Sequence, residues 1–302
     1  MVFNYLVCGL SVSSEFILPA YSIAGNAAAE VTIRRGQVPV PCLNEQGSRL
    51  YELIDSSTML FRAPGIVRFQ IVDGKQIVVE VEESGSEEQA VSFLLSTAIG
   101  IVLHQRQLLV LHASAVTLNG QALAICGPSG VGKSTLAAAL CQAGCHFVSD
   151  DISVIHQQVG GGHLLRPDGR QHRLWADSIA QLSLAGHQRE VVRAGWDKFH
   201  VNPAGNTLPV EAPLKAVIVL CPSVSQAPAG ISRLSGADAI ALLDQNVFRR
   251  QIAAGMGRSA QLFAQIAGLI SDVPILRFDR QTDFAGIRDD VRQVLEKLEH
   301  CK

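Results

Sequence analysis

The chain has 302 residues, a formal net charge of −2 at pH 7 and a hydrophobic fraction of 48%. This length predicts one large or two modest domains, and the hydrophobic fraction is sufficient for a buried core. The near-neutral charge argues against a nucleic-acid-binding protein, which typically carries a clustered excess of lysine and arginine. The longest apolar run, residues 90–103, is too short to span a bilayer, so no membrane association is expected.

The seven cysteines are scattered along the chain and form no Cys-x-x-Cys pair. In a chain of this length, such a distribution is typical of reduced and mostly buried thiols. The first residues lack the basic stretch and the apolar core of a signal peptide. We therefore expect a cytoplasmic protein. The sequence leaves open whether it forms homo-oligomers.

The first part of the chain, residues 1–105, is expected to form a small β-rich domain closed by a helix. The apolar runs Ile66–Val72 and Gln76–Val81 flank Asp73-Gly74, a pair typical of a hairpin turn. The sequence Ser86-Glu87-Glu88-Gln89 then matches a capping box, and acidic residues favour a helix N-terminus. This helix is predicted to continue to about residue 104.

A second hairpin is expected from strands Leu108–Thr117 and Gln121–Cys126. A two-residue turn at Asn119-Gly120 would set the register of these strands. Counting outward from that turn brings His112 opposite Gly127. The pattern therefore predicts a histidine beside the segment that follows the second strand.

The second part, residues 106–302, is expected to form an α/β domain with a central mixed sheet and flanking helices. Residues 157–212 show no regular pattern and are expected to be irregular. The remaining predicted elements are a helix at Ser134–Ala143, strands at His146–Val148, Leu214–Leu220 and Ile275–Phe278, and helices at about 236–252, 258–271 and 284–299.

The segment GPSGVGKST, residues 127–135, matches the phosphate loop GxxxxGK[ST]. Glycines allow the loop to adopt positive φ angles and to direct successive amides at one anion. An apolar strand before it and an Ala-rich helix after it argue against a glycine-rich turn without nucleotide. Lys133 is expected to reach the β- and γ-phosphates, and the Ser134 hydroxyl to bind Mg²⁺. The residues predicted to bind ATP are Gly127, Ser129, Gly130, Val131, Gly132, Lys133, Ser134 and Thr135.

Asp150 and Asp151 end the next predicted strand, where P-loop proteins place an acid near the metal and the γ-phosphate. We assign Asp150 as the general base and Asp151, with Ser134, to the metal, although the opposite division stays open. Consecutive side chains of a strand point to opposite faces, so both can act only if the chain turns here. The alternative is that one aspartate merely caps the next segment.

Other P-loop classes lack support in the sequence. No LSGGQ-like signature of transport ATPases and no NKxD motif of guanine-specific proteins occurs. The choice between ATP and GTP stays open, because contacts to the base leave no signature.

The stretch from residue 111 to 151 resembles the catalytic domain of HPr kinase/phosphorylase, with its strand histidine, phosphate loop and Asp-Asp ending. The whole chain more closely resembles the kinase-only relatives encoded beside lasso-peptide biosynthesis genes. That resemblance rests on the segments His172-Arg173-Leu174-Trp175, Lys198 and Val273-Pro274-Ile275-Leu276-Arg277. It implies an ATP- and Mg²⁺-dependent kinase for a peptide serine, the C-terminal serine of a lasso precursor, with His112 in the catalytic site.

Phosphoryl transfer requires positive charge near the transferred group. Arg173 and Lys198 are favoured as substrate-contacting residues, because they lie between core strands where a substrate loop would lie. The cations considered are Arg166, Arg173, Lys198, Arg249, Arg250 and Arg258.

Two alternatives to a peptide kinase stay open. One is a bifunctional HPr(Ser) kinase/phosphorylase, although the chain after the two aspartates lacks the glutamate-bearing signature of that family. The other is a nucleotide-sensing binding module without catalysis.

Overall fold

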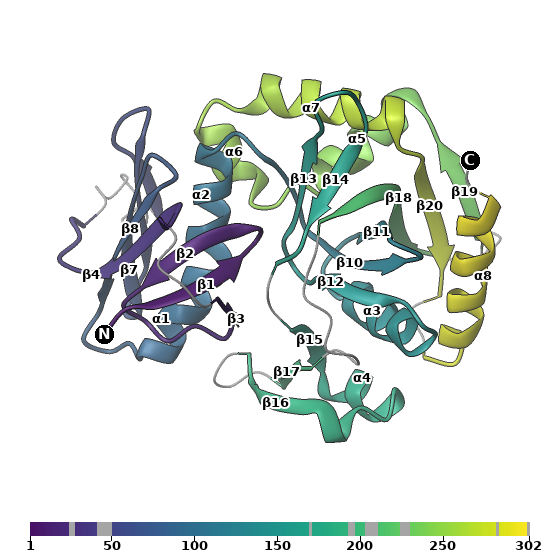
Figure 1. Cartoon of the computed structure of the whole chain (residues 1–302), viewed down its shortest axis with the longest axis horizontal. Coiled ribbons are helices and arrows are strands. Elements are labelled where there is room, and N and C mark those ends of the chain that lie inside the picture. Colours follow the sequence, from purple (N-terminus) through teal and green to yellow (C-terminus); the bar gives the residue numbers. More distant parts are fainter. Residues whose placement is uncertain are drawn as a thin grey trace.

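The computed structural model describes residues 1–23, 28–40, 50–168, 171–192, 197–202, 211–223, 230–281 and 284–300. The architecture is mixed α/β, with two lobes side by side (Figure 1). We call the part from strand β1 to helix α2 the N-terminal lobe and the part from strand β9 to helix α8 the C-terminal lobe. The change from one lobe to the other falls between Gln105 and Leu109.

The N-terminal lobe is built on one eight-stranded sheet in the order β3-β1-β2-β4-β8-β7-β6-β5. The predicted hairpin is confirmed, with Asp73 and Gly74 at φ 54° and 62° in the turn between β7 and β8. The strands are β1 Phe3–Val7, β2 Leu10–Ser14, β3 Tyr21–Ser22, β4 Val31–Arg35, β5 Tyr51–Leu53, β6 Thr58–Ala63, β7 Val67–Val72 and β8 Gln76–Val81.

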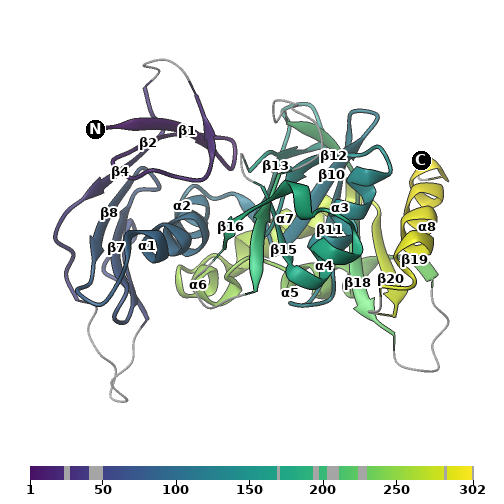
Figure 2. The same ribbon diagram turned by 90° about the horizontal axis from the view of Figure 1, so that it is seen from below.

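One long, mostly buried helix lies against this sheet (Figure 2). It consists of α1 Glu87–Phe93, a π-helical segment Leu94–Ala98 and α2 Ile99–Gln105. The predicted capping box is present, since the Ser86 hydroxyl accepts from the Gln89 amide at 3.2 Å and the Gln89 side chain accepts from the Ser86 amide at 3.1 Å. The π-helical turn was not predicted from the sequence.

The central sheet of the C-terminal lobe contains the parallel strands β11, β18 and β20. Strand β10 pairs antiparallel with β11, and β12 pairs antiparallel with the outer side of β10. Helices α3 and α8 cover one face of this sheet, and α5 and α7 cover the other (Figure 1). The strands are β9 Leu109–Leu111, β10 Ala113–Leu118, β11 Gln121–Cys126, β12 His146–Ser149, β13 Ser153–Gln157, β14 His163–Arg166, β15 His172–Trp175, β16 Gln188–Val191, β17 Lys198–Val201, β18 Ala212–Pro222, β19 Gly230–Leu234 and β20 Ile275–Arg280. The helices are α3 Lys133–Gln142, α4 Ala176–Gln181, a 3-10 turn Ala185–His187, α5 Gly236–Gln245, α6 Arg250–Gly255, α7 Ser259–Asp272 and α8 Ile287–His300.

Two chain segments that pair with each other both change sheet partners partway along their length. The predicted strand 108–117 is interrupted at His112, because β9 pairs with β13 whereas β10 pairs with β11 and β12. The segment that carries the two aspartates is interrupted in the same way, between β12 and β13. The predicted hairpin register is confirmed as far as Ala113 opposite Cys126. His112 and the aspartates thus lie where the sheet divides.

Two sequence-based predictions about the C-terminal lobe are wrong. The described part of residues 157–212 is not irregular but contains a small sheet, β15-β17-β16, and helix α4, whereas residues 169–170, 193–196 and 203–210 lie outside the described residues. The helix expected over 236–252 is divided into α5 and α6. The reason is that the His112 amide donates to the Asn246 carbonyl and the Phe248 amide to the Val110 carbonyl, so this segment pairs with β9.

The lobes share a hydrophobic core. Phe248 and Ile252 of the C-terminal lobe are buried among the residues of the N-terminal core. A Cβ atom at Gly100 would lie 2.6 Å from the Phe248 ring, so only glycine permits this close approach. The two lobes are therefore held in a fixed relation at this contact.

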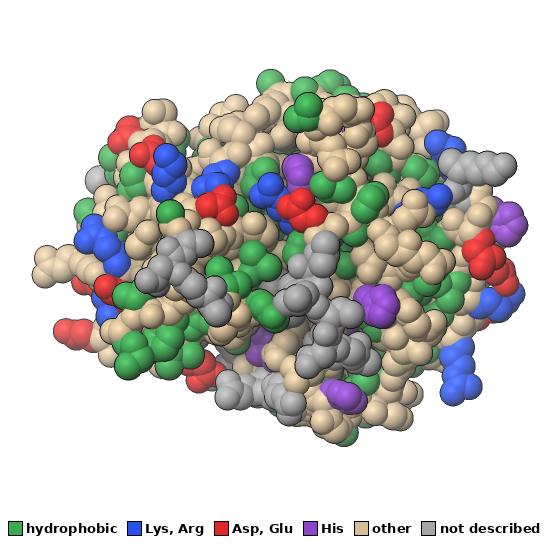
Figure 3. Space-filling view, in the orientation of Figure 1, with side chains coloured by type: hydrophobic (Ala, Val, Ile, Leu, Met, Phe, Trp, Pro, Cys, Tyr) green, Lys and Arg blue, Asp and Glu red, His purple; other side chains and the backbone are tan. Residues whose placement is uncertain are grey.

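Charged side chains are distributed without a broad region of one sign on the face drawn in Figure 3, where acidic and basic groups form small mixed clusters. Within the described part of the chain, no helix is both long enough and apolar enough to cross a membrane.

A buried histidine at the contact between the lobes predicts a pH-dependent stability. His104 Nε2 lies 2.7 Å from the Phe248 carbonyl oxygen, and Arg258 donates to His104 Nδ1 at 2.9 Å. Burial lowers the pKa of His104 to about 4. Since this pKa lies below the unfolded value of about 6.5, stability is complete above pH 6.5 and falls towards pH 4, by up to about 3 kcal/mol.

We expect His104→Gln to weaken this dependence, so that the free energy of unfolding falls less between about pH 7 and pH 4.5 than in the wild type. Urea unfolding at both pH values measures the difference. His187→Gln, a change at an exposed histidine, serves as the control. Identical losses in the wild type and His104→Gln would contradict the assignment.

Candidate functional site

A cavity of ≈ 520 Å³ lies among the phosphate loop, the small sheet β15-β17-β16 and the helix of the N-terminal lobe. This volume is in the range of small-molecule sites. With the exception of Gly127, a buried residue at the start of the loop, all the residues predicted for the site line this cavity. They are His112, Ser129, Gly130, Val131, Gly132, Lys133, Ser134, Thr135, Asp150, Asp151, Arg173 and Lys198.

The loop has the backbone geometry of an anion cradle. Gly127, Gly130 and Gly132 have φ angles of 140°, 82° and 95°. A Cβ atom at Gly127 would lie 2.7 Å from the Leu220 carbonyl oxygen, so a larger residue is excluded there. Helix α3 begins at Lys133 without a side-chain cap. Because the first amides of a helix lack intrahelical acceptors, they are directed at whatever occupies the loop.

The Lys133 ammonium is held by the loop itself. Its Nζ donates to the carbonyl oxygens of Gly127 at 2.9 Å and Pro128 at 3.1 Å. Burial lowers the pKa of Lys133. The ammonium is thus positioned within the cradle by neutral acceptors rather than by a carboxylate in direct contact.

Asn246 forms hydrogen bonds with both the phosphate loop and His112. Its Oδ1 accepts from the Gly127 amide at 2.8 Å, and its backbone carbonyl accepts from the His112 amide at 2.7 Å. Sequence reasoning missed this residue because it was placed inside a predicted helix. The only available signal was the poor helix propensity of asparagine.

Asp150 is buried and binds three other elements of the lobe. Oδ1 accepts from the hydroxyls of Ser114 at 2.6 Å and Ser134 at 2.8 Å, and Oδ2 accepts from the Arg173 amide at 2.7 Å. The Asp150 amide in turn donates to Asp168 Oδ2 at 2.9 Å. The carboxylate therefore faces the hydroxyl of the phosphate loop. Asp168 was not identified from the sequence.

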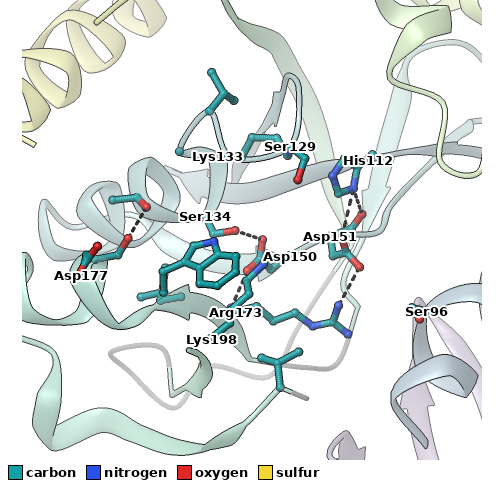
Figure 4. Close-up of a pocket in the computed structure, with 18 of the residues that line it drawn as sticks. Ser96, His112, Ser129, Lys133, Ser134, Asp150, Asp151, Arg173, Asp177 and Lys198 are labelled. Carbon is teal, nitrogen blue, oxygen red and sulfur yellow. Dashed lines mark hydrogen bonds and ion pairs between the residues drawn. The ribbon is translucent and has the colours of Figure 1, made fainter. Parts of the chain in front are cut away.

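Asp151 faces the other side of the same cavity. Its φ of 79° supplies the turn that the sequence required if both aspartates were to reach the site. Oδ1 lies 3.2 Å from His112 Nδ1, and Oδ2 accepts from Arg173 Nη1 at 2.8 Å. Figure 4 shows these three side chains together, with the Ser134–Asp150 contact beside them.

The small sheet supplies further lining residues. Trp175 of β15 pairs with Lys198 of β17, and Lys198 Nζ lies 5.8 Å from the centre of the Trp175 ring. Helix α4 follows directly, and its Ser178 hydroxyl lies 2.9 Å from the Thr135 hydroxyl. The predicted substrate residues Arg173 and Lys198 are therefore brought together with the loop.

Of the other cations considered from the sequence, all of them described residues, Arg249 alone lines the cavity. Arg166 pairs with Glu211 and Arg250 pairs with Asp244. Arg258 contacts His104, away from the cavity.

A cation that the sequence did not reveal is Arg280, at the end of β20. Its Nη1 donates to the Val131 carbonyl at 3.1 Å, and its Nε lies 2.7 Å from Asp290 Oδ2 of helix α8. Both side chains are buried. This pair ties the phosphate loop to the last strand and the last helix, which no local sequence pattern indicates.

No family model matches the chain. A protein of Sinorhizobium fredii (strain NBRC 101917 / NGR234), described as "Putative insertion sequence ATP-binding protein y4pL", is 54% identical over 56 residues, which are 17% of this chain and 22% of that protein. The chain therefore matches only about a fifth of that relative. The solved structure of the HPr(Ser) kinase/phosphatase from Coxiella burnetii covers 62% of this chain and 89% of its own, with 13% identity and a TM-score of 0.33.

Proposed function

We propose that this chain is an ATP- and Mg²⁺-dependent kinase that transfers the γ-phosphate to a serine hydroxyl of a peptide or small protein. The observation that carries the proposal is the meeting of the phosphate loop, Asp150, Asp151 and His112 in one cavity. We further propose that residues 106–302 form a P-loop domain of the HPr kinase type, preceded by a small β-rich domain, residues 1–105. The description of the Sinorhizobium relative as an ATP-binding protein supports the choice of ATP.

The triphosphate would lie in the loop. The uncapped start of helix α3 and the glycine-rich backbone offer amide donors to the phosphate oxygens. Lys133, now bound to two loop carbonyls, would exchange them for phosphate oxygens. The described lining of the cavity includes five cations and three carboxylates, so its balance of charge suits a polyanion. They are Lys133, Arg173, Lys198, Arg249 and Arg280, and Asp150, Asp151 and Asp177.

Ser134 and Asp150 fit the magnesium ion. Mg²⁺ prefers hard oxygen donors, and the Ser134 hydroxyl and the Asp150 carboxylate lie 2.8 Å apart within the cavity. When bound, Mg²⁺ neutralises charge on the β- and γ-phosphate oxygens. The sequence-based assignment gave the metal to Asp151 and the proton to Asp150. The contact with Ser134 favours the reverse division, and we propose it here.

Asp151 is then the general base. Its side chain is 22% exposed and borders the cavity. In the proposed step, the serine oxygen of the acceptor forms a bond to the γ-phosphorus while the bond to the β,γ-bridging oxygen breaks and ADP leaves. The hydroxyl proton passes to the Asp151 carboxylate. His112 and Arg173 hold that carboxylate in place from two sides.

The acceptor class follows from the resemblance to the lasso-peptide kinases, which implies a C-terminal serine. The cavity contributes a compatible feature, because both lobes border it and the Asp151 side chain is among its lining residues.

Substitution of Asp150 and of Asp151 should affect different properties of the protein. We expect Asp151→Asn to slow phosphoryl transfer by about 10²–10⁴-fold, as for loss of a general base, with little change in MgATP affinity. We expect Asp150→Asn to weaken the Mg²⁺ dependence of nucleotide binding. Label transfer from γ-labelled ATP and calorimetry with and without Mg²⁺ measure the two effects.

Asp289→Asn, on the exposed face of helix α8, is the matched control and should behave as the wild type. Wild-type turnover by Asp151→Asn would reject the proposed base. Unchanged Mg²⁺-dependent binding by Asp150→Asn would reject the proposed metal ligand.

The identity of the phosphate acceptor distinguishes the proposed peptide kinase from the two alternative functions. We expect label from γ-labelled ATP to appear on a peptide that ends in serine, and mass spectrometry to place it on that serine. Phosphorylation of HPr in place of the peptide would support a bifunctional HPr kinase/phosphorylase. Tight MgATP binding without transfer to either acceptor would support a nucleotide-sensing module.

A further inference from the structure

The N-terminal lobe forms one wall of the proposed active site. Ser92, Phe93 and Ser96 from its helix line the cavity. Figure 4 shows Ser96 on the side to which the Arg173 side chain extends. Ser92 and Phe93 end helix α1, and Ser96 lies within the π-helical segment Leu94–Ala98 that follows. Such π-helical turns occur frequently at functional sites. An acceptor that reaches Asp151 would therefore contact both lobes.

Arg249 connects this wall to the catalytic group. It follows Phe248, whose ring centre lies 6.1 Å from that of His112. Arg249 Nη2 donates to the hydroxyl of Thr97, a fully buried residue of the π-helical segment, at 2.9 Å. The guanidinium is thus directed across the contact between the lobes and borders the cavity.

The backbone of Arg249 has an unusual conformation. Its φ of 50° is in the left-handed region, which is uncommon for residues other than glycine. Such conformations often occur at ligand-binding positions. Here the left-handed residue separates Phe248, which is buried in the shared core, from the start of helix α6.

Arg249 also differs from two of the other four described cations of the cavity, which are engaged in ion pairs. Arg173 pairs with Asp151 and Arg280 with Asp290. Within the described residues, Arg249 has no carboxylate at ion-pair distance, although its side chain borders the cavity. Lys133 and Lys198 share this property, but Lys133 is held in the phosphate loop by two carbonyls and Lys198 lies over Trp175, in the small sheet. Arg249 is therefore the described cation without an ion-pair partner that lies next to the N-terminal lobe, where it can receive an anion.

We propose that Arg249 binds a carboxylate of the acceptor next to the reacting hydroxyl, and that both lobes form this acceptor subsite. The inference rests on the proposed kinase function. A planar guanidinium can donate two parallel hydrogen bonds to a carboxylate. A serine at the end of a peptide carries its α-carboxylate two bonds from the carbon that bears the hydroxyl, so one residue offers both groups. Thr97 orients the guanidinium for this contact.

Paired peptides with identical sequences that end in serine, one with a free carboxylate and one with a carboxamide, test this directly. The measured quantity is the ratio of kcat/KM for label transfer to the two forms. We expect the wild type to prefer the free acid by about 10- to 100-fold, as for a charge-assisted hydrogen-bonded pair. In Arg249→Gln the ratio should fall to about 1, chiefly through a higher KM for the free acid.

Arg250→Gln is the matched control, since Arg250 pairs with Asp244 outside the cavity, and it should retain the wild-type preference. Thr97→Val, which removes the hydroxyl that orients Arg249, should lower the preference without abolishing transfer. Calorimetry with MgATP on each variant reports the nucleotide site separately.

Three outcomes would overturn the inference. They are equal rates for both peptides in the wild type, a preference retained by Arg249→Gln, and an equal loss of both rates in that variant, which would place Arg249 at the nucleotide. The first of these leaves the kinase function intact. A wild type that binds MgATP but transfers phosphate to neither peptide would instead contradict the proposed function, and the inference with it.

Discussion

The carboxylate of Asp150 holds the proposed active site together. It accepts hydrogen bonds from a strand hydroxyl at Ser114, from the phosphate-loop hydroxyl at Ser134 and from the backbone amide of Arg173. Buried carboxylates require such partners, since an unsatisfied buried charge is strongly destabilising. The same three contacts fix the distance between the central sheet, the loop and the small sheet. The phosphate-loop hydroxyl of Ser134 and the Arg173 backbone are therefore both positioned by this one side chain.

The division of the sheet explains why Asp150 and Asp151 can serve different sides of one cavity. Two neighbouring chain segments change partners at the same level, one at His112 and one at the aspartates. A continuous strand would direct consecutive side chains to opposite faces. The left-handed conformation of Asp151 removes that restriction and brings its carboxylate to His112 and Arg173. The fold thereby supplies both a metal-facing acid and an acceptor-facing acid.

The sequence predicted the parts of the site that depend on local pattern. The phosphate loop, its helix, the hairpin register, the capping box and the aspartate pair all depend on residues close together in the chain. Contacts between distant segments were not predictable: Asn246 reaches the loop because its segment pairs with β9, and Arg280 because β20 ends beside the loop. The small sheet β15-β17-β16 was missed for a related reason, since its strands have four residues each and pair across segments without a clear alternating pattern.

A crystal structure with a non-hydrolysable ATP analogue and Mn²⁺ tests the central claim most directly, because anomalous scattering locates the metal independently of the protein. The account predicts the triphosphate along the loop, the metal between the Ser134 hydroxyl and Asp150, and the terminal phosphate facing Asp151. A metal bound on the Asp151 side, or a nucleotide bound away from the loop, would contradict it.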